Sequence, residues 1–499
     1  MKIKKMLAGI LACTVIGAVW QCSFFSNITS VSAEENTEDF IDEEPAEVFT
    51  YGVFTYEISD LFDKTIAITG CDKAAEGVID IPDKIDGLPV TKVNSGTFKD
   101  CLKITEINVP ESIESLSISI QSIKSENVSL LEAINVDENN EYYCSEDGIL
   151  FTKDKTQLKY YPPAHTGDTY VIPDSVNEIM GAFRFNRYLK SVTIPSSVES
   201  TGTVSFFGCT SLESVDIAYG VKSISFMSFM NCTSLKEITI PGSVEEINDA
   251  SFCGCSSLEK LVIEDGVKII NNDAEDLYGG TFEGCTKLKE ITVPESVEFI
   301  GKNVFEDTEW EKNLPDGMNY INNIAYRFKG EYTGDKEFVL RDGTAAVAGG
   351  AFKNVSGIET IVFPESVKEL NYFATIYCPD LKSVKILNPD CVLYCIFVDD
   401  NTFPDVDYTS LFHGNVFSWR NSDAHTYALE NDCNFIALDD DSVKGDVNGD
   451  GEISAADLVM LRKWVSNTGK LADTDAADVD ENGAIDIFDF CALRKILIG

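Results

Sequence analysis

The chain has 499 residues, with 83 acidic and 39 basic side chains and a formal net charge of −44. This charge repels phosphates and anionic lipid headgroups, so neither nucleic acid nor an anionic membrane is expected as a partner, whereas cations are attracted. Apolar residues make up 44% of the chain, enough for a large buried core, and the length predicts several domains or a long repeat array.

The N-terminus has the features of an export signal. Three lysines precede an apolar run, and Val31, Ser32 and Ala33 form a small-residue cleavage site. Residues 1–33 are therefore predicted to be a secretory signal peptide, and the protein to be secreted. A permanent membrane helix is the weaker alternative because polar residues from Gln21 onward interrupt the run, and lipidation at Cys13 would cut that run in half.

Residues 34–50 follow as an acidic segment, which is predicted to be disordered because it has little apolar surface to bury.

The body of the chain repeats one phrase. A phenylalanine returns after 23, 23, 30 and 23 residues, at Phe206, Phe229, Phe252, Phe282 and Phe305, and the first four begin copies of the form F-x-x-C-x-x-L-x-x-I-x-I-P-x-S-V-x-x-I. Within a unit, Ile238 and Ile240 alternate as a short strand requires, and Pro241 ends the strand. One unit cannot bury its own apolar residues, so stacked units are predicted to form a solenoid with continuous internal ladders.

Four cysteines occupy the same slot of successive units: Cys209, Cys232, Cys255 and Cys285. Equivalent slots lie one repeat apart and point the same way, so we expect small buried thiols rather than disulfides. A metal site is the alternative, but the chain offers no CxxC pair there, and Cys253 and Cys255 stand too close together to carry it alone.

This pattern resembles the BspA-like leucine-rich repeat family, over residues 51–438. Two divergent stretches, beginning at Tyr142 and Met318, are predicted to be hairpin-like interruptions, and the end of the region, from Asn421, is similar to the family's closing unit and would cap the open core. Fold class is thus predicted as a mainly β leucine-rich-repeat solenoid.

The residue between the two alternating apolar positions of each strand is expected to face outward. These positions are Thr193, Asp216, Thr239, Val262, Thr292 and Val362. Such a face could bind protein or glycan, although threonine is also simply a good exposed strand residue. The seven-residue insertion within 273–280 is a second candidate contact region.

The C-terminal region contains two acidic loops with the spacing of a twelve-residue calcium loop. Side-chain or backbone oxygens at alternate positions converge on one ion, and a glycine permits the sharp turn. The first loop supplies Asp446, Asn448, Asp450, Glu452, Ser454 and Asp457, and the second, 32 residues later, supplies Asp478, Asp480, Asn482, Ala484, Asp486 and Asp489. A solvated acidic turn explains one such string, but hardly two copies with matching helices.

The first loop leaves no room for an entering helix, and both loops end in Asp rather than Glu. These features resemble the type I dockerin family over residues 445–499, after a linker at 439–444. The resemblance implies a small all-α module that holds two Ca²⁺ ions and binds a cohesin domain of a cellulosome scaffold.

The same resemblance implies which residues face the partner. They are Ala455, Ala456, Leu461, Arg462 and Lys463 in the first copy, and Ile487, Phe488, Leu493, Arg494 and Lys495 in the second. Because the basic pairs match and the loop pairs do not, we expect two unequal faces. The basic pairs also suit the negative end of a helix dipole without any partner.

Catalysis is not expected. The three histidines lie outside the regular repeats, and a solenoid offers an extended surface rather than a deep cleft. The leading hypothesis is a secreted, non-catalytic binding subunit in a polysaccharide-degrading assembly. A structural spacer and a polysaccharide-degrading enzyme are the alternatives.

Overall fold

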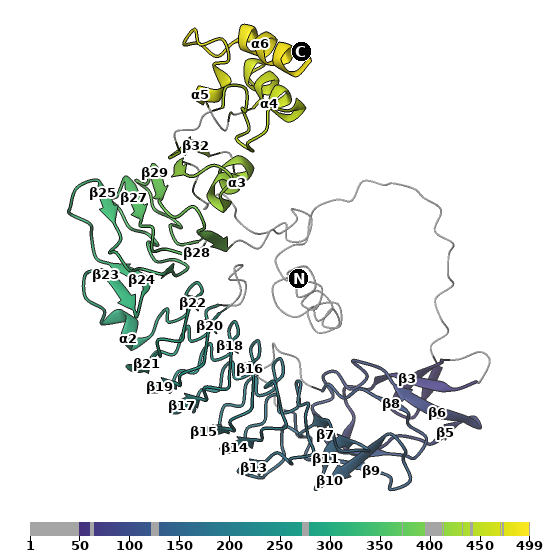
Figure 1. Ribbon diagram of the computed structural model, residues 1–499. Helices are drawn as coiled ribbons and strands as arrows, with labels where there is room; N and C mark the ends of the chain where they lie inside the picture. Colours follow the sequence, from purple (N-terminus) through teal and green to yellow (C-terminus); the bar gives the residue numbers. More distant parts are fainter. Residues whose placement is uncertain are drawn as a thin grey trace. The chain divides into compact units, whose positions relative to one another are not determined.

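A computed structural model describes residues 49–59, 64–120, 129–271, 279–371, 373–394, 412, 414–431, 433–439, 443–469, 471 and 474–498. The predicted signal peptide and nearly all of the acidic segment lie outside these residues. The chain divides into two compact units, residues 1–221 with 228–235, and residues 222–227 with 236–499. Each is mainly β (Figure 1).

The first unit opens with a mixed sheet and continues with short parallel strands. The mixed sheet holds β1 (Phe49–Tyr51), β2 (Phe54–Ile58), β3 (Ile66–Cys71), β6 (Leu88–Val93), β5 (Lys84–Ile85) and β8 (Ser115–Leu116). Parallel sheets follow as β4 (Glu76–Asp80), β7 (Lys103–Val109) and β9 (Ala133–Val136), and later as β13 (Thr169–Val171), β14 (Ser191–Ile194) and β15 (Ser214–Ile217). β1 begins two residues before the predicted start of the domain at residue 51.

In the second unit the successive repeats add strands to two parallel sheets. One sheet contains β16 (Ser223–Ile224), β18 (Glu246–Ile247), β20 (Ile269–Ile270) and β22 (Phe299–Ile300). The other contains β17 (Glu237–Ile240), β19 (Lys260–Ile263) and β21 (Glu290–Thr292). The register runs straight, with Ile238 beside Leu261 and Ile240 beside Ile263. Figure 1 shows these strands as successive rungs.

Two five-stranded sheets complete the repeats of this unit. One contains β23 (Gly317–Ile321), β24 (Ile324–Lys329), β26 (Ala346–Val347), β28 (Glu369–Asn371) and β30 (Val392–Tyr394). The other contains β25 (Glu337–Val339), β27 (Thr360–Phe363), β29 (Ser383–Ile386), β31 (Asn415–Ser418) and β32 (Asn434–Ala437). The helices are α2 (Glu309–Lys312), α3 (Asp423–Glu430), α4 (Ala455–Val465), α5 (Thr474–Ala477) and α6 (Ile487–Ile498).

The phenylalanine ladder predicted from the repeat is confirmed. Phe206 stacks on Phe229 in the first unit with ring centroids 5.0 Å apart and planes 1° apart. In the second unit Phe252 stacks on Phe282 at 5.1 Å and 6°. All four rings are fully buried, so each repeat covers the apolar face of its neighbour as a solenoid requires.

The slot cysteines are buried thiols, as predicted. The thiols of Cys209, Cys232 and Cys285 each donate to the carbonyl oxygen of the phenylalanine one repeat earlier, at 3.0, 3.2 and 3.2 Å. Burial raises the pKa of Cys209 to about 12. The slot therefore contributes a hydrogen bond between repeats, and its thiols are chemically unreactive.

The two predicted interruptions are antiparallel hairpins. β10 (Tyr143–Glu146) pairs with β11 (Ile149–Thr152), which also pairs with β12 (Leu158–Tyr160), and β23 pairs with β24. The second hairpin is fixed to α2 by an ion pair of 3.0 Å between Arg327 Nε and Glu311 Oε1, both nearly buried. Parallel repeats resume after each hairpin.

The expected closing unit covers the end of the repeat core. Ser422 caps α3, and the helix buries Ala424 and Ala428 in the same apolar cluster as Phe435 of β32. β32 pairs with β31 as the last strand of its sheet. This end of the solenoid core is thereby closed to water.

Candidate functional site

The first acidic loop is held by the carboxylate at its first position. Asp446 accepts hydrogen bonds from the amides of Asp450 and Gly451, at 3.1 and 2.8 Å. Asn448 Oδ1 accepts a hydrogen bond from the amide of Asp450, and Asp450 Oδ1 accepts one from the amide of Glu452. The backbone of the loop therefore turns around its own side-chain oxygens.

The last loop position ties the loop to α4. Asp457 is fully buried, and its two oxygens accept from the amides of Asn448 and Ser454, at 2.9 and 2.7 Å. The Ser454 hydroxyl accepts from Ala456 and completes a capping box at the start of the helix.

The second loop repeats this arrangement bond for bond. Asp478 accepts from the amides of Asn482 and Gly483, each at 3.0 Å, and Asp489 accepts from Asp480 and Asp486, at 3.1 and 2.8 Å. Three further bonds match those of the first loop. The amide of Asn482 donates to the Asp480 side chain, the amide of Ala484 donates to the Asn482 side chain, and the amide of Phe488 donates to the Asp486 side chain.

The donor set of the loops fits a hard cation. One carboxylate oxygen from each of Asp478, Asp480 and Asp489 lies within 4.8 Å of the others, and within the described residues this is the one such group of His, Cys, Asp or Glu. Burial raises the pKa of Asp446, and the carboxylates of Asp457 and Asp450 act in the same direction. Oxygen-only ligands that repel one another are the environment that Ca²⁺ occupies in proteins.

Eight of the ten residues expected to face a partner are exposed: Ala455, Ala456, Arg462, Lys463, Ile487, Phe488, Arg494 and Lys495. The other two are corrected. Leu461 and Leu493 are completely buried, because both point between α4 and α6 into the module core with Val447 and Leu471. Their matching positions in the two copies reflect packing.

Five of the six predicted outward positions are open to solvent, and the sixth, Val362, lies outside the core cluster but is covered. Thr193, Asp216, Thr239, Val262 and Thr292 are at least partly exposed. Val362 is only 7% exposed. The reason is an ion pair of 2.7 Å between Lys385 on β29 and Glu337 on β25, because these strands flank β27 and the pair spans it. Most of the candidate insertion, residues 273–278, lies outside the described residues.

A polar hollow in the first unit was not predicted. It has a volume of about 550 Å³ and is lined by Glu106, Glu132, Asn135, Asp147 and His165, among others. Asn135 donates to Glu106 at 3.2 Å, and His165 Nε2 donates to the Asp147 carbonyl at 3.0 Å. Its residues come from β7, from β9 and the residue before it, from the β10–β11 hairpin and from the turn after β12, with no shared motif, so no sequence signal identifies it.

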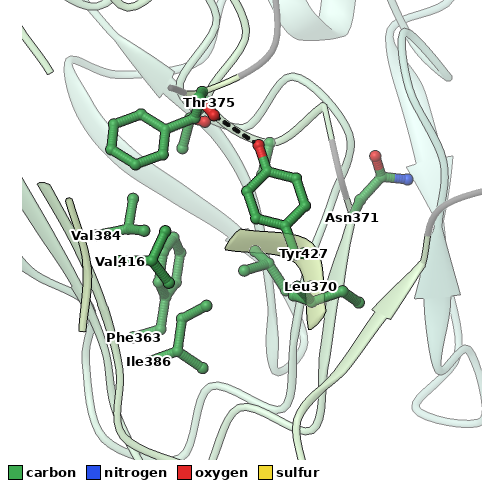
Figure 2. Close-up of a pocket in the computed structure, with 11 residues that line it drawn as sticks. Phe363, Leu370, Asn371, Thr375, Val384, Ile386, Val416 and Tyr427 are labelled. Carbon is green, nitrogen blue, oxygen red and sulfur yellow. Dashed lines mark hydrogen bonds between the residues drawn. The ribbon is translucent and has the colours of Figure 1, made fainter. Parts of the chain in front are cut away.

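An apolar pocket of about 40 Å³ lies in the second unit near the closing unit. Figure 2 shows Thr375 and Tyr427 on its wall with Phe363, Val384 and Ile386, and the Tyr427 hydroxyl donates to the carbonyl oxygen of Phe412 at 2.7 Å. Most of this wall belongs to the apolar core of the repeats.

No helix in the described part of the chain has the length and apolar character needed to cross a membrane.

Comparison with known proteins agrees with both regions. The model of the BspA type leucine rich repeat region matches residues 78–157, 167–275, 269–382 and 325–403, and the model of the dockerin type I domain matches residues 444–498. Dockerin type I domains bind calcium and have cohesin domains as partners. Neither matched domain is catalytic. Among curated proteins there is no match.

Several solved bacterial structures are similar to the chain at low identity. A leucine rich cell surface protein from Faecalibacterium prausnitzii is 18% identical, with 80% of this chain and 97% of that chain covered and a TM-score of 0.35. A leucine-rich repeat protein from Eubacterium ventriosum is 18% identical, with 54% and 96% covered and a TM-score of 0.36. The pneumococcal vaccine antigen PcpA is 14% identical, with 79% and 99% covered and a TM-score of 0.32.

The matched repeats span more than half of the 499 residues, and their hairpins, parallel rungs and phenylalanine ladder are those of the described fold. The chain therefore belongs to the BspA type leucine rich repeat family and carries a dockerin type I domain at its C-terminal end.

Proposed function

We propose that this protein is a secreted, non-catalytic binding subunit that docks onto a cohesin-bearing scaffold in a calcium-dependent manner. Residues 445–499 form the docking module, residues 439–444 the linker, and the repeats of residues 51–438 present a surface for a protein or glycan. A cellulosome-type assembly engaged in polysaccharide breakdown is the setting that this combination of domains favours.

The observation that carries the proposal is the duplicated hydrogen-bond scheme of the two loops. In each loop the first and last carboxylates accept the same four backbone amides, and in the second loop oxygens of Asp478, Asp480 and Asp489 lie within 4.8 Å of one another. Each loop would hold one Ca²⁺, so the module takes two ions. When bound, the ions would offset the repulsion among the buried carboxylates and fix the starts of α4 and α6.

The two faces of the module are chemically unequal, which supports preferential binding through the second copy. Ile487 is 51% exposed and Phe488 is 66% exposed, whereas the equivalent residues of the first copy are Ala455 and Ala456. A partner that covers the second copy removes far more apolar surface from water. The exposed basic pairs, which are the same in both copies, would add electrostatic attraction on either face.

Titration of the full chain against a panel of type I cohesin domains, in calcium and in chelator, tests the proposal. Binding is expected with at least one cohesin and only in calcium. Substituting both Ile487 and Phe488 by Asp should weaken binding at least tenfold, and substituting both Ala455 and Ala456 by Asp should change it little. Equal losses would contradict the asymmetry, and no binding to any cohesin would contradict the docking role.

The repeats need a separate test, because their ligand does not follow from the docking module. The chain lacking residues 445–499 can be applied to a glycan array and used to capture secreted proteins. A specific glycan or protein supports the binding role of the outward strand face. Two empty results favour the structural spacer, and release of reducing sugar from plant polymers would establish the enzyme alternative.

A further inference from the structure

Two cysteines meet at the N-terminal end of the first unit. Cys71 is the last residue of β3, and Cys101 follows Phe98 at the spacing with which Cys209 follows Phe206. The two thiols face the same acceptor, the carbonyl oxygen of Asp72, at 3.8 Å from Cys71 Sγ and 3.6 Å from Cys101 Sγ. Residues that are 30 positions apart in sequence therefore bring their sulfur atoms into one small space.

This contact differs from that of the other slot cysteines. The thiols of Cys209 and Cys232 lie 3.0 and 3.2 Å from a phenylalanine carbonyl of the preceding repeat. Cys101 belongs to the first repeat, so β3 lies before it instead, and its thiol is 3.6 Å from the carbonyl of Cys71. The backbone carbonyl of Cys71 thus stands where the other repeats place a phenylalanine carbonyl, and this brings a second cysteine next to the slot.

Access also separates this pair from the remaining cysteines of the slot. Cys71 is partly exposed at the strand end, while Cys101 lies directly beneath it with no exposed surface. Cys255 and Cys285, which also adjoin each other one repeat apart, are both completely buried. A soluble oxidant can reach the first pair through Cys71 and has no such route to the second.

We propose that Cys71 and Cys101 form a disulfide by exchange with a small-molecule disulfide of the glutathione type. The Cys71 thiolate attacks one sulfur of the oxidant and releases one small thiolate. Cys101 then attacks the Cys71 sulfur of the mixed disulfide and expels the second small thiolate, which leaves the Cys71–Cys101 bond. The protein loses two electrons and two protons, and the oxidant becomes two thiols.

The two thiols interact directly with each other in the reduced protein. A hydrogen bond from the Cys71 thiol lowers the pKa of Cys101 and raises that of Cys71. Cys71 loses this S–H when it forms the mixed disulfide, so access rather than pKa assigns the order of the steps: the partly exposed Cys71 attacks the oxidant and the buried Cys101 resolves. Burial raises the pKa of Cys209 to about 12 and keeps that thiol inert.

The bond would tie the opening sheet to the first repeat. Phe54, Ile68 and Phe98 share one apolar cluster with Cys101, and Cys71 packs against it. A cross-link between residues 71 and 101 restricts the unfolded chain and so favours the folded end of the solenoid. This inference concerns the stability of the repeats and is independent of cohesin docking.

The test uses the full chain with Cys491→Ser, because Cys491 is an exposed thiol that would form its own adduct. The protein is incubated with oxidised glutathione, its remaining thiols are blocked, and the digest is analysed by mass spectrometry without reduction. A linked Cys71–Cys101 peptide is expected, with a higher unfolding temperature of the repeats that returns to the starting value on reduction. A persistent glutathione adduct on Cys71, no reaction at either residue, or no rise in unfolding temperature would overturn the proposal.

Substitutions assign the order of the steps without relying on stability. Cys101→Ser should trap glutathione on Cys71 as a stable adduct, and Cys71→Ser should leave Cys101 unmodified. Cys144→Ser is the matched control, since Cys144 is another partly exposed thiol of the same unit and its loss should leave the linked peptide unchanged. Should Cys101→Ser fail to fold, the peptide map of the Cys491→Ser chain still decides the outcome.

Discussion

The leucine-rich repeats and the dockerin module both stack copies of one sequence unit, but they are stabilised by different forces. In the repeats, equivalent apolar side chains lie on one another, as Phe183, Phe206 and Phe229 do. In the module, α4 and α6 share a small apolar core, and each loop is held by a buried carboxylate, Asp457 or Asp489. Apolar stacking needs only a neighbouring copy, whereas gathered carboxylates need a cation as well.

The largest expected effect is the response to calcium removal. In calorimetry of the full chain, the transition of the dockerin module should disappear in chelator, because metal binding supplies much of its folding free energy. The transitions of the repeats should stay at the same temperature, and magnesium serves as the control ion. A shift of the repeat transitions of similar size would contradict the separation between the two regions.

Phe206→Ala tests whether the stacked phenylalanines stabilise the repeats. It removes a ring that stacks on Phe183 at 4.6 Å and on Phe229 at 5.0 Å, so the free energy of unfolding of the first unit should fall by roughly 3–5 kcal/mol. Urea unfolding followed by circular dichroism measures the loss, and calcium affinity should not change. Tyr219→Ala is the control, since Tyr219 is 76% exposed and should cost little. Equal losses for the two variants would show that the ladder is not the source of stability.

The substitutions Asp457→Asn and Asp489→Asn test whether the two loops, which share the same hydrogen bonds, also contribute equally to the stability of the module. Each carboxylate accepts from two backbone amides, and an asparagine can accept only one and sets an N–H against the other. Each variant should destabilise the module by about 2 kcal/mol and lower calcium affinity, measured by calorimetric titration. Glu481→Gln, an exposed change in the second loop, is the control. Unequal losses would mean that one loop dominates folding.

The repetition in the sequence explains which features could be predicted. A side chain in a stacked unit has the same neighbours one repeat on, so the phenylalanine ladder, the buried thiols and the two loops follow from spacing alone. Val362 alternates with the core residues Ile361 and Phe363 as expected, but it is covered because Lys385 and Glu337, on the two flanking strands, pair across it. Leu461 and Leu493 match in both copies, but spacing does not distinguish a residue that packs from one that faces a partner.

Features without a repeat could not be predicted in this way. Cys71 and Cys101 meet because the first repeat has a cap strand for a neighbour in place of another repeat, and the hollow beside His165 collects residues from unrelated turns. In both cases the contact depends on how a divergent segment folds onto a regular one. Such contacts are set by tertiary packing that no local pattern in the sequence encodes.

Thr375 is the position at which the apolar ladder of the second unit is interrupted. It stands 23 residues after Phe352 and three before Cys378, whose thiol donates to the Phe352 carbonyl at 2.9 Å as the other slot cysteines do. Thr375 therefore occupies a phenylalanine slot, and the pocket in Figure 2 is the space that the missing ring leaves.

Thr375→Leu should fill part of this space and raise the free energy of unfolding of the second unit by about 1 kcal/mol, the smallest effect considered. Leucine adds apolar volume close to that of the pocket without the bulk of a full ring. Thr375→Ser, which enlarges the pocket, should act in the opposite direction, and urea unfolding measures both. If leucine destabilises the unit, the neighbouring Tyr427 and Phe412 have already adjusted to threonine, and the repeats do not gain from an uninterrupted ladder at their closing end.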